Sequence, residues 1–233
     1  PEGAAALRFA VDRNRYVPLM TRPGLSPRYQ RQQAEHLDRL ARLYRAIASV
    51  SGARVLIDSS KHASYALLLS QIPGIDLRLL HVVRDSRAVA HAWTRTVPRP
   101  EAGGVPMPVY GPAKAAVLWD LQNTLIERLR QQHPYIRVRY EDFVEAPKDI
   151  LLQIALFAGL PDDPSTLGFL DGDTITVSPS HSVAGNPMRF VSGDITITSD
   201  HRWSTEMPAG RRRYVSALTL PLHRLYGYQS GLR

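Results

Sequence analysis

The chain alternates between stretches whose apolar residues recur at helical spacing and short runs that are almost wholly apolar. Helical spacing predicts amphipathic helices over residues 29–50, 62–72, 86–95, 113–131, 147–158 and 209–225. Short apolar runs predict buried strands over residues 54–58, 77–83 and 136–140. Because a strand–helix–strand–helix order favours right-handed crossovers, we expect an α/β fold in which helices flank a parallel sheet.

Three stretches show no clear period. Residues 1–28 mix Arg, Pro and Gly and are expected to be irregular, and residues 161–208 are expected to be loops with short extended pieces. Residues 96–112 are rich in Pro and Gly, which predicts a long loop, and long loops in compact domains often contact ligands. A length of 233 residues suits one α/β domain or a domain with a small annex, and no internal repeat is visible, so we expect residues 1–233 to form a single domain.

Composition narrows the classes of function. The formal net charge is +8, which favours an anionic partner such as a nucleic acid, a phosphate-rich cofactor or a membrane surface. The chain has no cysteine, which excludes disulfides, thiolate catalysis and cysteine zinc sites, and which fits a cytoplasmic protein. No apolar run reaches the roughly 18 residues of a membrane-spanning helix, so we expect no membrane span. No signal-peptide pattern is visible either.

Polar side chains follow each predicted strand, where open parallel sheets bind ligands. Arg84 ends the second strand, and the next residues open a helix. Free N–H groups at a helix start and a guanidinium fork both suit a phosphate, which makes this segment a candidate anion site. The alternative is that Asp85 or Ser86 caps the helix while Arg84 pairs with a surface carboxylate.

The other two strand ends carry weaker signals. After the first strand, Lys61 can neutralise an anionic group in transfer, and His62 can act as a base near neutral pH. The alternative is a capped turn with Lys61 and His62 at the surface. The third strand ends at Tyr140, which two acidic residues follow, and the alternative there is a simple edge turn.

Five segments together resemble a known family. They read VLIDSSKH at 55–62, HVVRDSRAV at 81–89, RYED at 139–142, HSVAGNPMRF at 181–190 and PLHRLYGY at 221–228. In this order they resemble the bacterial members of the sulfotransferases that use 3′-phosphoadenosine 5′-phosphosulfate (PAPS). The resemblance implies a P-loop-like α/β fold and sulfuryl transfer from PAPS to a hydroxyl or amine of a small-molecule acceptor.

The resemblance also implies roles for individual residues. It implies that Arg84 binds the 3′-phosphate and that Tyr140 lies beside the adenine. It implies that a loop with Gly185, Asn186 and Arg189 closes over the same phosphate. By the same resemblance His62 is the general base and Lys61 lies near the sulfuryl group. Positioning and positive charge should do most of the catalysis in such an in-line transfer, and no metal is required.

Two features depart from the family. The family places a serine that binds the 3′-phosphate where this chain has Ala92. One neutral hydrogen bond contributes about 0.5–1.5 kcal/mol, so affinity would fall by about tenfold, and His91 or Arg95 are candidates to compensate. The family also opens with a strand, a Gly/Ser/Thr-rich loop and a helix that cradle the 5′-phosphosulfate, and the given sequence shows none of these. We expect that segment upstream of Pro1; the alternative is a protein that does not hold the sulfuryl donor.

Other classes of function remain open on the sequence alone. A nucleic-acid-binding module would use the basic helix at 39–45 and the run at 211–213, although we expect no nucleic acid. A P-loop nucleotide kinase would need a phosphate loop that is absent here. Apolar residues in 9–28 and 96–112 suggest an apolar or aromatic acceptor, or simply pin these loops to the core; they are Phe9, Tyr16, Met20, Met107 and Tyr110. The sequence predicts no particular oligomeric state.

Overall fold

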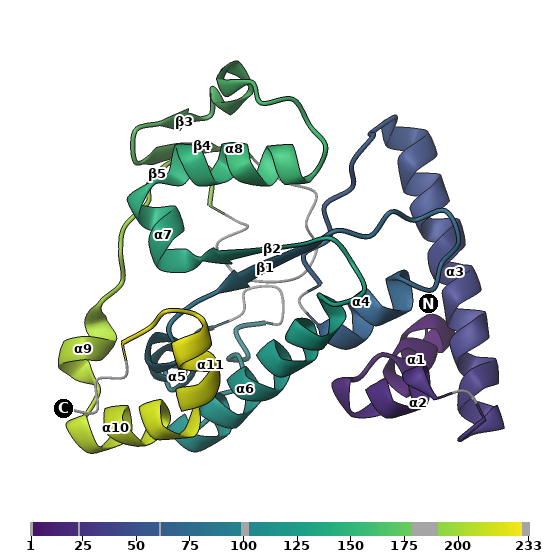
Figure 1. The fold of residues 1–233 in the computed structure, drawn as a ribbon, viewed down its shortest axis with the longest axis horizontal. Coiled ribbons are helices and arrows are strands. Elements are labelled where there is room, and N and C mark those ends of the chain that lie inside the picture. Colours follow the sequence, from purple (N-terminus) through teal and green to yellow (C-terminus); the bar gives the residue numbers. More distant parts are fainter. Residues whose placement is uncertain (1, 23, 61, 99–102, 179–190, 230–233) are drawn as a thin grey trace. The chain divides into compact units, whose positions relative to one another are not determined.

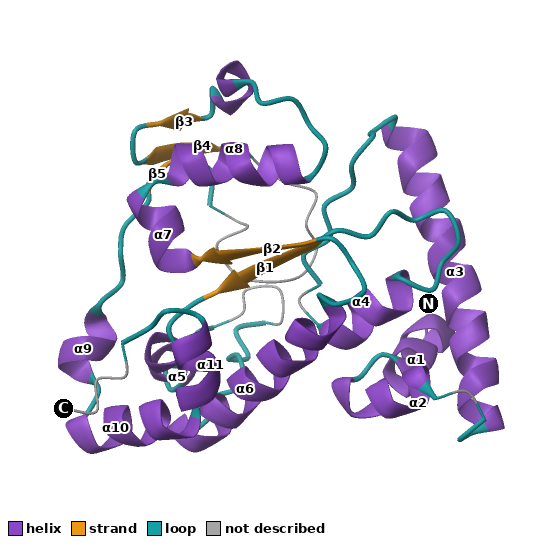
Figure 2. Ribbon diagram, viewed as in Figure 1, coloured by secondary structure: helices purple, strands orange, loops and turns teal. Residues whose placement is uncertain are grey.

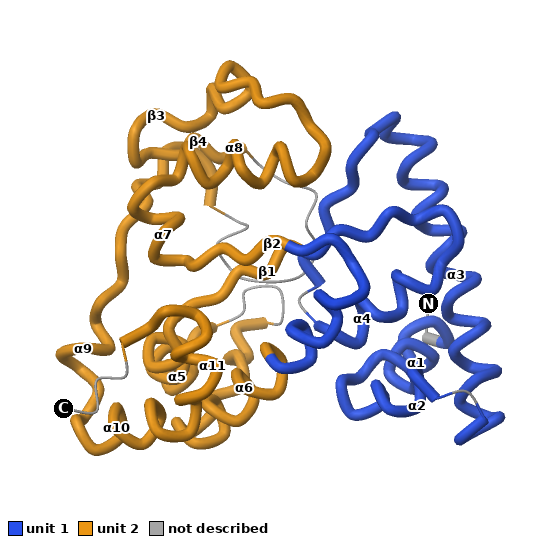
Figure 3. The backbone as a smooth tube through the Cα atoms, viewed as in Figure 1, with its two compact units in different colours: residues 1–79, 124–135 blue, residues 80–123, 136–233 orange. Residues whose placement is uncertain are grey.

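The computed structural model describes residues 2–22, 24–60, 62–98, 103–178 and 191–229 (Figure 1). Its contacts divide the chain into two compact units (Figure 3). Unit 1 is made of residues 1–79 and 124–135, and unit 2 of residues 80–123 and 136–233. The expectation that both belong to a single domain stays a prediction. No helix in the described part of the chain is long and apolar enough to cross a membrane.

Unit 1 is built on α3 (Pro27–Ser51), which confirms the helix predicted over residues 29–50. The Ser26 hydroxyl accepts a hydrogen bond from the Tyr29 N–H and caps the start of the helix. Gly52 ends it in the left-handed region with φ of 62°, a conformation that glycine adopts without steric cost. A shorter helix, α4 (Ala63–Leu69), supplies the fully buried Leu68 to the core of this unit.

The expectation that residues 1–28 are irregular is wrong. They form α1 (Glu2–Val11), a 3-10 turn (Asn14–Tyr16) and α2 (Val17–Thr21). Leu7 and Val11, four residues apart on α1, are both buried, and α1 packs against α3. This i, i+4 pair follows three alanines, which have the strongest helix propensity, so a helical signal was present in the sequence.

The predicted strand over residues 54–58 is also wrong. These residues have no regular secondary structure, and the Ile57 side chain is 89% exposed. A strand is stable only when a neighbour takes up its backbone hydrogen bonds, and in the described part of the chain no strand pairs with this run. The segment therefore stays an extended loop at the surface of unit 1.

The main sheet belongs largely to unit 2 and joins β1 (Leu79–Val83) with β2 (Tyr135–Arg139) in parallel (Figure 2). Helices follow both strands: α5 (Ser86–Trp93) and α6 (Pro112–Leu129) come after β1, and α7 (Tyr140–Glu145) and α8 (Pro147–Phe157) after β2. The fold is thus α/β, with a parallel sheet flanked by helices, as predicted. The sequence did not indicate α7, which begins directly at the end of β2.

The C-terminal part of unit 2 is more regular than its loop-rich sequence suggests. The strands β3 (Leu170–Asp171), β4 (Thr174–Val177) and β5 (Gly193–Thr196) form an antiparallel sheet in this order. A short helix, α9 (Arg202–Glu206), follows. The helix predicted over residues 209–225 is two helices, α10 (Ala209–Leu218) and α11 (Leu220–Leu225). They part next to Pro221, whose ring is accepted only in the first turn of a helix.

Candidate functional site

The end of β1 places Arg84 and Asp85 directly before α5. The Asp85 carboxylate accepts a hydrogen bond from the Arg87 N–H at 2.8 Å and so caps the helix. The Arg84 guanidinium lies 3.2 Å from the Asp200 carboxylate. The structure therefore shows the arrangement of the capping alternative, an N-cap and an arginine paired with a carboxylate, at the same place where the anion site is predicted.

Arg84 has a second neighbour from the end of β2. Its guanidinium carbon lies 4.8 Å from the ring centre of Tyr140, and the Tyr140 hydroxyl donates to the carbonyl of Thr198 at 3.3 Å. The Arg84 side chain is 25% exposed, so it remains within reach of a ligand from solvent. The structure thus brings together Arg84 and Tyr140, the two residues expected to hold the phosphate and the adenine of a nucleotide.

A buried polar network holds this strand end in place. Arg87 forms a two-pronged ion pair with Asp85, with a shortest distance of 2.6 Å, and both side chains are less than 10% exposed. The fully buried His223 of α11 approaches Asp85 to 3.4 Å. Burial alone would raise the pKa of the Asp85 carboxyl, but hydrogen bonds from His223 and Arg87 hold that pKa well below its usual value.

Glu141, the second residue of α7, ties β1 to the C-terminal tail. One of its carboxylate oxygens accepts from the Asp85 N–H at 3.1 Å, and the other accepts from the Tyr228 hydroxyl at 2.8 Å. Next to this link, the Ser86 and Thr219 hydroxyls lie 2.8 Å apart in the core. Burial, followed by the hydrogen bond to Glu141, raises the pKa of Tyr228, so this phenol stays protonated as a donor.

His62 lies in unit 1, at the N-cap position of α4, and its exposed side chain makes no capping hydrogen bond. The turn before it is held by Asp58, whose carboxylate accepts from the hydroxyls of Tyr44 and Ser60 and from the Ser60 N–H. Although burial opposes it, these hydrogen bonds lower the pKa of Asp58. The turn thus has its own rigid support, and the imidazole of His62 stays accessible.

Four of the expected site residues lie outside the described part of the chain: Lys61, Gly185, Asn186 and Arg189. Their roles stay predictions. Of the two residues named to compensate for Ala92, His91 is engaged with Glu206 at 3.0 Å. Arg95 is exposed and has no ion pair within the described ranges, so it is the better placed of the two.

The Pro-rich loop folds back on itself between α5 and α6. Pro98 and Pro106 form an isolated antiparallel bridge, and the Met107 N–H donates to the Val97 carbonyl at 2.8 Å. At its base the Trp93 and Tyr110 rings stack, with their centres 4.8 Å apart, and the Tyr110 ring also contacts Lys114. The loop leaves several apolar side chains in solvent, namely those of Val97, Val105, Met107 and Val109.

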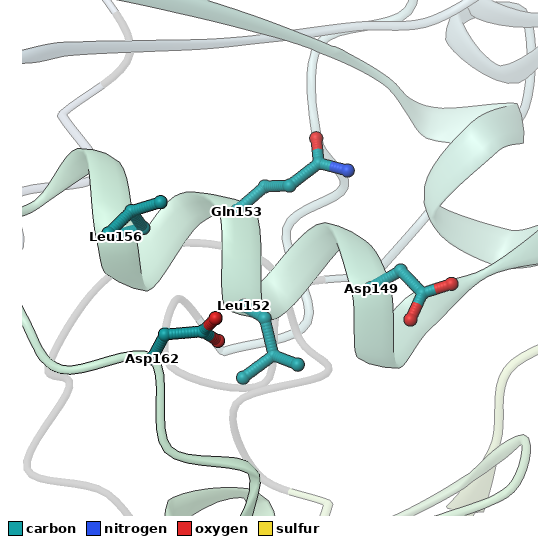
Figure 4. Close-up of a pocket in the computed structure, with 5 residues that line it drawn as sticks. All are labelled: Asp149, Leu152, Gln153, Leu156 and Asp162. Carbon is teal, nitrogen blue, oxygen red and sulfur yellow. The ribbon is translucent and has the colours of Figure 1, made fainter.

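Each unit has a cavity of about 180 Å³ among its described residues. The unit 2 cavity lies along α8, between Asp149 on the helix and Asp162 after it, and its lining includes none of the predicted site residues (Figure 4). The unit 1 cavity is lined by Ala63, which directly follows His62 in the sequence, and by Thr21 from the segment 9–28, whose apolar residues suggest an acceptor contact. Its lining is mostly apolar and consists of Val17, Thr21, Ala63, Leu67, Leu125, Arg128, Leu129 and Gln132.

Sequence reasoning missed the partners of the predicted residues. Asp200, which pairs with Arg84, lies in a stretch expected to be loop, as does Trp203, whose ring lies 4.3 Å from the Arg87 guanidinium carbon. Both are more than a hundred residues away from their partners along the chain. No local pattern links such pairs, and only a contact between them could have revealed the connection.

Comparison with known proteins supports the fold. No family model matches the chain, and no curated protein matches its sequence. A solved structure, "Sulfotransferase Domain from the Curacin Biosynthetic Pathway", matches with a TM-score of 0.53 and 17% sequence identity. The match covers 94% of this chain and 78% of that one. The chain therefore has the fold of a sulfotransferase domain.

Proposed function

We propose that this protein transfers a sulfuryl group from PAPS to a hydroxyl or amine of a small-molecule acceptor. The observation that carries the proposal is the position of Arg84 and Tyr140. An arginine at the carboxyl end of β1 contacts an aromatic ring at the carboxyl end of β2, in a fold shared with a sulfotransferase domain. Parallel α/β sheets bind nucleotides at this edge.

In the proposed complex Arg84 binds the 3′-phosphate of the nucleotide, and Tyr140 lies against the adenine. Gly185, Asn186 and Arg189 close over the phosphate. An arginine fork matches two phosphate oxygens at once, which gives geometric specificity as well as charge. The half-buried setting of Arg84 strengthens this pairing relative to one in bulk water.

The proposed reaction is an in-line displacement at sulfur. The acceptor oxygen or nitrogen forms a bond to sulfur while the bond from sulfur to the phosphate oxygen breaks. His62 takes the acceptor proton, and 3′-phosphoadenosine 5′-phosphate (PAP) leaves. Lys61 offsets charge on the sulfuryl oxygens, and no metal takes part. A positioned base contributes about 10²–10⁴-fold to such a rate.

The acceptor is proposed to carry an apolar or aromatic group. The unit 1 cavity supports this, because it is mostly apolar and its lining includes Val17 and Thr21 of the segment 9–28 and Ala63, the residue that follows His62 in the sequence. Its volume of about 180 Å³ is comparable to that of engineered cavities of about 150 Å³ that bind benzene. The exposed apolar residues of the Pro-rich loop, such as Met107, offer a second contact surface.

A nucleic-acid partner has less support. On the basic stretch of α3, Arg39 pairs with Glu35 at 2.6 Å and Arg42 pairs with Asp38 at 2.7 Å. These pairs neutralise much of the charge that phosphates would have to meet. We therefore retain a small anionic nucleotide, and not a nucleic acid, as the proposed ligand.

The test is calorimetric binding of PAP and of 5′-AMP to the wild type and to Arg84→Ala. We expect PAP to bind at least tenfold more tightly than 5′-AMP, and Arg84→Ala to remove this difference because the arginine is the proposed phosphate ligand. Arg224→Ala, which removes an exposed arginine of unit 2, is the matched control. Equal affinity for both nucleotides, or an Arg84→Ala protein that still prefers PAP, would contradict the proposal.

A further inference from the structure

Among the residues that the structure describes, Asp200 is the carboxylate that pairs with Arg84. Its carboxylate lies 3.2 Å from the guanidinium, and its backbone carbonyl accepts from the same Nη2 atom at 3.4 Å. The two side chains are 25% and 27% exposed, so the pair lies at the rim of the site and not in the core. A carboxylate therefore occupies the position in which a ligand phosphate would meet Arg84.

Asp200 does not depend on Arg84 for a partner. Its two carboxylate oxygens accept from Arg202 Nε and Nη2, each at 2.8 Å, and the Arg202 N–H adds a third contact at 3.2 Å. The pKa of Asp200 is lowered mainly by these hydrogen bonds from Arg202, and to a smaller extent by Arg84. Separation of Asp200 from Arg84 would leave the carboxylate fully paired, which makes the separation inexpensive.

We propose that Asp200 is a competing internal anion, which holds Arg84 until a ligand phosphate displaces it onto Arg202 alone. This inference rests on the proposed function in so far as the displacing ligand is a 3′-phosphorylated nucleotide. The exchange sets a threshold for binding. A phosphate monoester carries about −1.5 to −2 charges at pH 7, which is more negative charge than a single carboxylate has, so it can displace Asp200 from Arg84. A ligand with a single negative charge has no such advantage.

The opposite role for Asp200 makes opposite predictions. A carboxylate that merely orients Arg84 would improve ligand binding, and its removal would weaken that binding. A competing carboxylate lowers the affinity, and its removal would tighten binding. The sign of the change in affinity therefore separates the two roles.

The experiment measures calorimetric affinities for PAP and for inorganic phosphate in Asp200→Asn and Arg202→Gln. Asp200→Asn should increase the affinity for both ligands by roughly three- to tenfold, which corresponds to the energy of a partly exposed ion pair. Arg202→Gln should weaken both by roughly threefold, because Asp200 then has Arg84 as its main partner. Asp162→Asn and Arg224→Gln, which alter exposed charges elsewhere in unit 2, are the matched controls.

The outcomes separate this inference from the proposed function. If Asp200→Asn leaves affinity unchanged or lowers it while Arg84→Ala abolishes PAP binding, the competing role is overturned and the function stands. If Asp200→Asn tightens phosphate through Arg84 but PAP binds no better than 5′-AMP, the competing role stands and the function falls. If no variant binds either anion, both fall. Asp200→Asn should no longer increase the affinity for phosphate when Arg84→Ala is also present, and that result would support the competing role.

Discussion

The end of β1 in unit 2 and residues 58–60 in unit 1 each lie beside a candidate site residue, and different interactions hold them in place. At the end of β1, a capping carboxylate is buried with an arginine and a histidine, and the strand itself is paired. In the turn, Asp58 is held by hydroxyl groups near the surface, after a run that forms no strand. Position is therefore fixed by buried ion pairs in one region and by hydrogen bonds from uncharged donors to an exposed carboxylate in the other.

The difference has a functional meaning under the proposed reaction. A phosphate-binding arginine gains from a rigid support, because a preorganised guanidinium loses little entropy on binding. A general base has to reach a variable acceptor, and the exposed position of His62 gives it access to one. Variants at the two places should accordingly separate effects on stability from effects on activity.

The largest expected effect belongs to His62→Gln. We expect kcat to fall by about 10²–10⁴-fold, because the proposed base is lost. The free energy of unfolding should change by less than about 0.5 kcal/mol, because the side chain is exposed and makes no capping bond. Steady-state kinetics and urea unfolding check the two parts, and an unchanged kcat would remove His62 from the mechanism.

Next in size is Asp85→Asn. The substitution leaves the buried Arg87 without a matching charge, so we expect about 3–5 kcal/mol of lost stability at pH 7 by urea unfolding. The pKa of Asp85 is lower in the folded protein than in the unfolded chain, so its contribution is complete above about pH 5 and is lost as the pH falls below about 4.

The pH dependence offers a control for that substitution. The stability difference between wild type and Asp85→Asn should shrink as the pH falls below about 4, and it should keep shrinking below pH 3, because the folded-state pKa of Asp85 is far below that of the unfolded chain. The exposed Asp162→Asn removes the same charge from unit 2 and should change stability little at pH 7. A difference between wild type and Asp85→Asn that grows in acid would show that the Asp85 network does not carry the stability assigned to it.

The smallest effect is expected for Tyr44→Phe in unit 1. The phenylalanine keeps the ring but removes the hydroxyl that donates to Asp58, which should cost about 1 kcal/mol of stability. If this turn positions His62, kcat should also fall by a few-fold while KM for PAP stays constant. Tyr65 should not restore kcat in this variant. Its hydroxyl lies 3.3 Å from that of Tyr44 and contacts Tyr44 rather than Asp58.

Much of the helical part of the fold could be predicted because its signals are local. The apolar period within 29–50 and the capping residue before Ser86 each lie within a few residues of the helix they specify. The strand over 77–83 was predicted correctly, whereas the similar run over 54–58 was not a strand. The two runs differ in whether another strand pairs with them. The residues within a run do not determine whether such a partner strand exists.

Some residues of the candidate site could likewise be predicted from the sequence, and others could not. Arg84 and Tyr140 could be named from the sequence because each stands at the end of a strand-like run and within a segment that resembles the sulfotransferases. Asp200 could not, because its contact with Arg84 spans 116 positions along the chain and depends on how the antiparallel sheet β3–β5 returns the chain to the end of β1. The three short strands of that sheet have too few residues each to show an alternating pattern.

Trp93 stacks on Tyr110 at the base of the Pro-rich loop, so tryptophan fluorescence can report on this loop. Trp93 is 38% exposed, whereas Trp119 is 7% exposed and donates its indole N–H to the Arg84 carbonyl. An added quencher such as acrylamide would therefore reach the indole of Trp93 more readily than that of Trp119. Once Trp203, the third tryptophan, is replaced by Phe, the intrinsic fluorescence of the protein can report separately on a ligand at the loop and on one at the end of β1.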